Sequence, residues 1–251
     1  GYHSNYYTLK ALPQPKVVDL NIFLNYPSYT KIKDKSIKNN GDLVIPEGTI
    51  VRWDASVQNT KNVTLVFPKS KHSQSTNKTF SYRRPFFINT PYQIIIQNEY
   101  SLSDSLSYFI KVTPDAFPLI KVNQTFDSTS SQFLFNGEIE DDYLLQKLTF
   151  NYRITSNDTS PLISQKIPIK QLSKEIFFFS FKFDELQLDA GTGIEYYFEV
   201  WDNDGIHGSK NTKSNHFLYK EASREDLITK KDVENNKTKS GLNKSISLAE
   251  E

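Results

Sequence analysis

Large apolar side chains stand at every second position in short runs along this chain. The clearest run contains Phe177, Phe179, Phe181 and Phe183. Successive side chains of a β-strand point to opposite faces of a sheet, so a period of two indicates a strand with one buried face. A helix would instead need apolar residues three and four positions apart. This alternation predicts a β protein.

Expected strands recur at short intervals with no helical pattern between them, which is typical of sandwiches and barrels. In the first half they cover residues 20–24, 49–57, 63–67, 79–82, 92–97 and 106–112. In the second half they cover residues 119–122, 132–139, 147–154, 166–169, 176–183, 194–201 and 215–219. Pro27 and the turn clusters 39–42 and 46–48 separate some of these runs, because proline cannot donate to a ladder and Asn and Gly favour turns.

The spacing predicts an all-β chain with two tandem immunoglobulin-like or fibronectin-III-like β-sandwiches. We expect an extended lead-in (residues 1–19), a first domain (20–113), a linker (114–118), a second domain (119–220) and a polar tail (221–251). Pro114 and Pro118 should keep the linker extended and fairly stiff. The tail is either disordered or the start of a helical region, since Ser223 resembles a helix N-cap but few apolar residues follow.

Composition excludes several classes of function. The 30 basic and 29 acidic residues give a net charge of +1, which provides no basic face for nucleic acid. The absence of cysteine rules out disulfides and thiolate chemistry and favours a bacterial or cytosolic origin. No apolar run reaches the roughly 18–20 residues of a membrane span, and no signal peptide is visible. A chain that opens at Gly1 and contains no methionine suggests a piece of something longer.

The motifs of enzymes are missing as well. There is no Gly-x-Ser-x-Gly elbow and no glycine-rich phosphate loop, so neither serine hydrolysis nor nucleotide binding has support. The four histidines lack the spacing of a zinc site; they are His3, His72, His207 and His216. We therefore expect no enzyme, no cofactor and no small-molecule substrate.

One acidic constellation is a candidate metal site. Its members are expected in the linker and in two loops at one end of the second sandwich: Asp115, Glu140, Asp141, Asp142, Asp202 and Asp204. Calcium takes six to eight oxygen ligands, so these carboxylates could brace a hinge between the domains. The alternative is ordinary turn chemistry, in which Asp caps its own backbone and Lys147 and Lys210 supply charge partners.

Five motifs occur in an order found in one group of proteins. They are Tyr26-Pro-Ser-Tyr-Thr30, Ile45-Pro-Glu-Gly-Thr49, Val112-Thr-Pro-Asp-Ala-Phe-Pro118, Glu140-Asp-Asp-Tyr-Leu-Leu145 and Tyr196-Tyr-Phe-Glu-Val-Trp-Asp-Asn-Asp-Gly205. In this the chain resembles the extracytoplasmic immunoglobulin-like region of large, uncharacterised bacterial envelope proteins. Those proteins have N-terminal membrane helices and a long Gln- and Glu-rich helical region. The resemblance implies a periplasmic location, with the membrane tether in segments outside this chain.

The expected function is a non-catalytic structural or protein-interaction module, a spacer or scaffold for protein partners in an envelope complex. Exposed sheet edges would supply contacts, with strand addition as one binding mode. The alternative is a carbohydrate-binding module appended to an envelope enzyme. Its candidate aromatic platform consists of Tyr82, Tyr92, Tyr100 and Tyr108.

Overall fold

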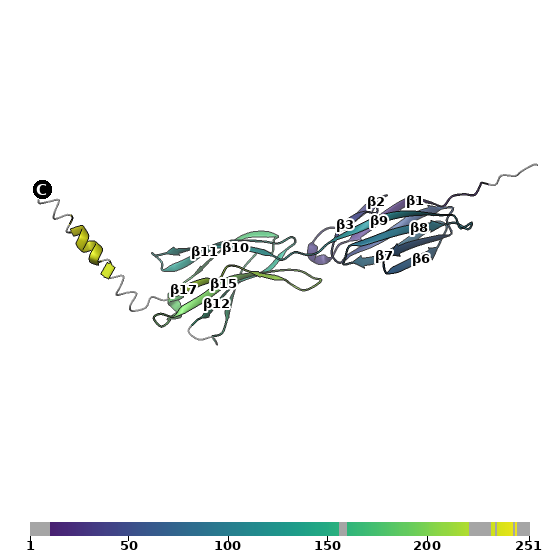
Figure 1. The fold of residues 1–251 in the computed structure, drawn as a ribbon. Helices are drawn as coiled ribbons and strands as arrows, with labels where there is room; N and C mark the ends of the chain where they lie inside the picture. The colour runs from purple at the N-terminus through teal and green to yellow at the C-terminus, as the bar shows by residue number, and fades with distance from the viewer. Residues whose placement is uncertain (1–10, 156–159, 221–231, 234, 243, 245–251) are drawn as a thin grey trace, which may run out of the picture. The chain divides into compact units, whose positions relative to one another are not determined.

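The computed structural model describes residues 11–155, 160–220, 232–233, 235–242 and 244. The chain divides into two compact units. The first contains the chain up to Ala116 together with Asp204–Gly208, and the second contains Phe117–Asn203 and the chain from Ser209 onward. Each unit is built from two β-sheets (Figure 1), so the predicted all-β sandwich fold is confirmed.

In the first unit one sheet has the strand order β2-β1-β4-β7 and the other has the order β3-β9-β8-β5-β6. Only β3 and β9 are parallel; the other paired strands of this unit are antiparallel. The bounds are β1 Lys16–Asn25, β2 Lys35–Lys38, β3 Leu43–Pro46, β4 Thr49–Gln58, β5 Asn62–Phe67, β6 Ser70–Ser75, β7 Thr79–Phe86, β8 Thr90–Gln97 and β9 Ser103–Thr113. A short 3₁₀ helix, Ser28–Thr30, follows Pro27, where the sequence predicted the strand to end.

The core of the first unit forms around Trp53, which is fully buried. Strand β4 alternates buried and less buried residues along its length, so Val51, Trp53 and Ala55 point inward together. The Trp53 ring meets Phe67 and Phe86 edge to face. Aromatic burial of this kind is a main source of sandwich stability, because large apolar areas leave water.

In the second unit one sheet has the order β10-β11-β14, and the other has the order β13-β12-β15-β16, with β17 also paired to β15. The paired strands of this unit are antiparallel. The bounds are β10 Leu119–Asp127, β11 Gln132–Glu140, β12 Leu145–Ile154, β13 Ile163–Ile167, β14 Lys174–Phe181, β15 Gly193–Asp202, β16 Asn211–Lys213 and β17 Phe217–Lys220. Its buried core is rich in Phe and Tyr, with Phe135, Phe150 and Phe198 in mutual ring contact.

Several boundaries differ from the expected ones. Strand β1 begins at Lys16, inside the predicted lead-in, and β14 ends at Phe181 because the chain turns into a 3₁₀ helix at Phe183–Leu186. Phe183 is nevertheless buried. Strands β2, β3, β6 and β16 were not predicted. Strands β2, β6 and β16 are short or polar and lack an apolar pattern, whereas β3 is apolar but has only four residues. Such strands form through pairing with a neighbouring strand.

Residues 114–118 lie between β9 and β10 and have no regular structure. In the tail, residues 232–233 and 235–242 are helical, whereas the rest of the predicted tail, apart from residue 244, falls outside the described residues. Across the described ranges, no helix combines the length and the apolar character needed to cross a bilayer.

Candidate interaction site

Four of the predicted acidic residues belong to the second unit, where Asp141 is the most unusual. Its side chain is 7% exposed, and its Oδ2 accepts a hydrogen bond of 3.0 Å from the Tyr143 backbone N–H. Its Oδ1 is buried without a hydrogen-bond partner among the described residues. Burial, reinforced by the nearby charges of Asp142 and Asp202, raises the pKa of Asp141 to about 6, since a carboxylate loses hydration there.

Asp202 is also buried, and a cation compensates its charge. Its Oδ1 accepts a 2.7 Å hydrogen bond from the Lys210 backbone N–H, and its Oδ2 lies 3.3 Å from Lys210 Nζ. The Lys210 partner proposed from the sequence is therefore in place. Glu140 is exposed and forms a 3.2 Å ion pair with Lys174.

The other two predicted ligands, Asp115 and Asp204, belong to the first unit. Asp204 Oδ1 accepts hydrogen bonds from the backbone N–H groups of Ile206 and His207, at 2.7 and 3.3 Å. This is the turn chemistry expected as the alternative. Within the part of the chain that the structure describes, no three His, Cys, Asp or Glu side chains are grouped to hold a metal ion. The calcium hinge stays a prediction.

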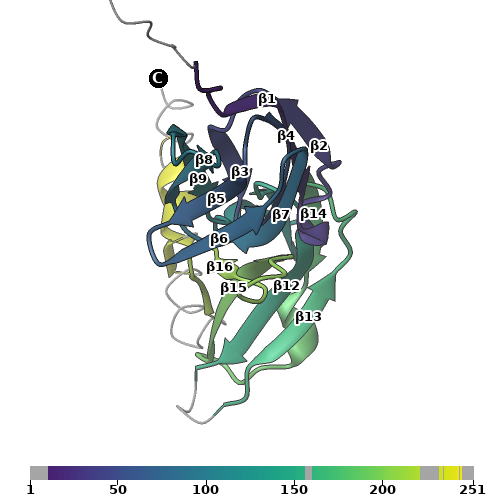
Figure 2. The same cartoon turned by 90° about the vertical axis from the view of Figure 1, so that its right-hand side faces the viewer.

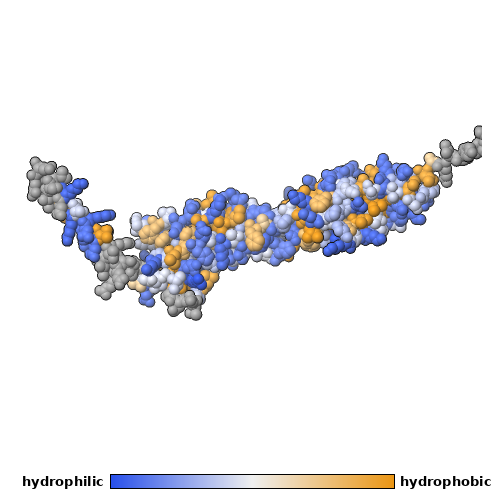
Figure 3. Space-filling view, viewed as in Figure 1, coloured by the Kyte–Doolittle hydropathy of each residue, from blue (hydrophilic) through white to orange (hydrophobic). Residues whose placement is uncertain are grey.

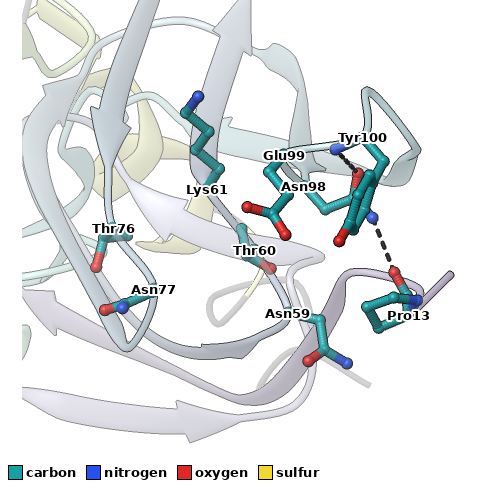
Figure 4. Close-up of a pocket in the computed structure, with 9 residues that line it drawn as sticks. All are labelled: Pro13, Asn59, Thr60, Lys61, Thr76, Asn77, Asn98, Glu99 and Tyr100. Atoms are coloured by element: carbon teal, nitrogen blue, oxygen red, sulfur yellow. Dashed lines mark hydrogen bonds between the residues drawn. The ribbon is translucent and has the colours of Figure 1, made fainter.

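A polar pocket of about 650 Å³ lies at one end of the first sandwich (Figure 4). Asn98 shapes its wall: its Oδ1 accepts hydrogen bonds from the N–H groups of Tyr100 and Leu102, and its Nδ2 donates to the Pro13 carbonyl. Thr60 and Thr76, which also line it, donate their hydroxyls to backbone carbonyls. Much of this polarity thus serves loop structure.

The tyrosines proposed as a sugar-binding platform do not share one exposed face. Tyr92 is buried, and Tyr82 and Tyr108 are partly buried against the core. Only Tyr100 is substantially exposed, at 41%, and it lines the polar pocket. A sugar-binding face needs several coplanar exposed rings, and these four residues do not provide one.

A second candidate site lies along strand β14 of the second unit, which is labelled in Figure 2. It lies at the end of its sheet and, among the described residues, pairs only with β11. Its outward side chains Ile176 and Phe178 are 64% and 77% exposed. Apolar side chains also interrupt the polar surface elsewhere on both units (Figure 3), but here they lie on a strand whose outer backbone groups are available for pairing.

The other edge strands carry features that discourage pairing. Strands β2, β3, β16 and β17 have three or four residues each. The longer ones carry charges or proline within the strand: Lys71 in β6, Arg83, Arg84 and Pro85 in β7, Lys121 in β10 and Lys166 in β13. Such residues protect natural edges from adding further strands. From Ile176 to Phe181, β14 has neither charge nor proline.

Charges are confined to the start of β14. Lys174 forms ion pairs with Glu138 and Glu140 on the neighbouring strand β11. Glu175 Oε2 accepts a 2.8 Å hydrogen bond from the Lys170 backbone N–H. These charged groups therefore have partners on the same unit, and the rest of the strand, apart from Ser180, is apolar. The sequence predicted contacts through exposed sheet edges, but it did not indicate that β14 is the edge strand.

Comparisons with known proteins do not assign this chain to a family. No family model matches the chain, and no curated protein matches it either. A solved structure of a 1.5-MDa bacterial ice-binding adhesin is 14% identical, with a TM-score of 0.38, over 72% of this chain and 60% of that one. This chain therefore spans less than two thirds of that structure.

Two further solved structures are similar to this chain. The fibronectin(III)-like modules of Clostridium thermocellum CbhA are 11% identical, with a TM-score of 0.26, over 74% of this chain and 90% of that one. Dimeric latent PorU from Porphyromonas gingivalis is 11% identical, with a TM-score of 0.27, over 84% of this chain and 20% of that one. The envelope family expected from the motifs stays a prediction.

Proposed function

We propose that this chain is a non-catalytic protein-interaction module that binds an extended partner strand along β14. The observation that carries the proposal is the edge from Ile176 to Phe181, which is uncharged and, apart from Ser180, apolar. A partner strand would receive main-chain hydrogen bonds from the outer side of β14 and apolar contacts from Ile176 and Phe178. Strand addition in this form gives affinity through the backbone and specificity through alternate side chains.

We place this module in the envelope of a bacterium, as part of a membrane-tethered protein. The order of the five motifs and the absence of cysteine support this placement. We also propose a spacer role, because the chain contains two consecutive sandwich units. The carbohydrate-binding alternative has less support, because Tyr100 alone of the four candidate rings is substantially exposed.

Screening a displayed peptide library for binding to the full 251-residue chain tests the proposal. We expect enrichment of short peptides with alternating apolar residues, and their binding should protect β14 amides from hydrogen exchange. Phe178→Lys should abolish binding, because it places a charge on the edge. The matched control is Leu218→Lys, which changes a 69% exposed apolar residue on the short strand β17. Peptides that bind Phe178→Lys as well as the parent chain would contradict the proposal.

A further inference from the structure

We infer that the strand bound by β14 is β14 of a second copy of this chain, paired antiparallel about a twofold axis at Phe177. This inference rests on the proposed function and names its partner. It is argued from three properties of the edge: its self-complementary side chains, its charge pattern and the absence of charge and proline from Ile176 to Phe181.

Face and register restrict how two copies of β14 can pair. A twofold axis perpendicular to the sheet keeps inward residues opposite inward residues, so each residue lies opposite one of the same parity. Centring the pair on Phe177 sets Ile176 of one copy opposite Phe178 of the other, twice. The two outward apolar residues, which lie next to Glu138 and Asn136 of β11, then form a continuous apolar strip across the junction.

Neighbouring registers are less favourable. A shift that centres the pair on Phe178 sets Lys174 opposite Lys182 of the other copy, and like charges directly opposite each other destabilise a strand pair. That shift also sets Ile176 opposite Ser180. In the Phe177-centred register Lys174 lies opposite Ser180, and no charged residue of β14 lies opposite a like charge. A shift that centres the pair on Ile176 sets Phe178 opposite Lys174 and leaves only one outward apolar pair. The sequence of the edge therefore favours the Phe177-centred register.

The pairing joins two three-stranded sheets into one six-stranded sheet. Aromatic and β-branched cross-strand pairs each stabilise a sheet modestly, and the shared backbone hydrogen bonds remove two unpaired edges at once. An association of this size is a weak, reversible dimer rather than an obligate one, because a strand junction buries less area than a standard interface. The dimer should therefore depend on concentration.

The first test measures the mass of the full chain by sedimentation equilibrium from micromolar to millimolar concentrations. We expect a monomer–dimer equilibrium whose dissociation constant rises by at least about tenfold in Phe178→Lys and in Ile176→Lys. Leu218→Lys should leave it unchanged. Far-ultraviolet circular dichroism and melting curves confirm that each variant folds, which the exposure of both edge positions makes the expected result.

The second test determines the register. The chain has no cysteine, so introduced thiols cross-link without background. A mixture of Ile176→Cys chains and Phe178→Cys chains should form a mixed disulfide under mild oxidation, because directly opposed residues lie within bridging distance. Each variant alone should form little disulfide-linked dimer.

Specific outcomes overturn the inference. A chain that stays monomeric at millimolar concentration excludes the second copy, while peptide binding to β14 would still support the proposed function. A dimer that survives Phe178→Lys lies elsewhere on the molecule. Self-cross-linking of Phe178→Cys in preference to the mixture contradicts the Phe177-centred register.

Discussion

Trp53 and Tyr92 join the two sheets of the first sandwich through a buried hydrogen bond. The indole Nε1 of Trp53 donates to the Tyr92 hydroxyl at 3.1 Å, and their rings meet edge to face with centroids 5.3 Å apart. The same hydroxyl donates to the Gly41 carbonyl at 2.8 Å. One phenol oxygen therefore connects strands β4 and β8 with the turn before β3.

Replacing Tyr92 with Phe removes that oxygen and leaves the indole N–H and the Gly41 carbonyl without it. A buried polar group left unpaired costs about 1–3 kcal/mol, so we expect Tyr92→Phe to lower the free energy of unfolding by about 2–3 kcal/mol. Urea denaturation followed by tryptophan fluorescence measures this. The control is Tyr108→Phe, whose hydroxyl makes no hydrogen bond to the described residues; an equal loss there would contradict the explanation.

Gly137 in β11 has no room for a side chain. A Cβ atom there would lie 2.4 Å from Phe177 Cε1 and 2.7 Å from the Lys121 carbonyl oxygen. Gly137→Ala should therefore destabilise the second sandwich by about 1–3 kcal/mol, because one neighbour is backbone and cannot yield easily. Thermal melting checks this against Gly241→Ala, where a Cβ meets nothing within 4 Å. A melting temperature unchanged in Gly137→Ala would show that β11 and β14 are less closely packed.

Asp141 should make stability depend on pH in an unusual direction. Its pKa in the folded chain is about 6, raised from 3.8 by burial first and then by neighbouring carboxylates. Between these values the folded state holds more protons than the unfolded state, so stability falls as the pH rises through 6. Asp141→Asn should be more stable than the parent by about 1–2 kcal/mol at pH 8, with the difference vanishing near pH 4.

Denaturation curves of both proteins from pH 4 to about 8 measure this difference. Asp142→Asn serves as a second variant, because the Asp142 charge contributes to the raised pKa of Asp141. Asp142→Asn should lower the pKa of Asp141, so the pH range over which stability falls should move toward lower pH. A stability difference between parent and Asp141→Asn that does not vary with pH would contradict the assignment to Asp141.

The calcium hinge predicted from the sequence has a direct test. A bound ion stabilises the folded state by mass action, so millimolar calcium should raise the melting temperature and titration calorimetry should record heat. Asp141→Asn should weaken both effects, since it removes one of the proposed ligands. An unchanged melting temperature without binding heat would exclude the calcium site.

Period-two alternation in the sequence was sufficient to predict the fold class and most strands of both sandwiches. Trp53, Ile22 and Phe177 point inward as their positions predict, because the alternation of side chains along a strand is local geometry. The acidic residues were located in loops for a similar reason, since Asp and Asn supply turn hydrogen bonds to nearby backbone, as Asp204 does.

Only the tertiary structure decided which strands lie at an edge and which polar segments become strands. Strand β6 has no apolar pattern, yet it pairs with β5 along its length. Trp201 is only partly buried, with Lys147 Nζ lying 4.1 Å from the centre of one of its rings. Phe178 belongs to an apolar run like any core segment, but it is 77% exposed because it faces outward on β14, and β14 pairs with β11 alone in the described chain. Local alternation assigns a residue to a face of its strand, whereas the pairing of strands distant in sequence determines whether that face, or that edge, is covered.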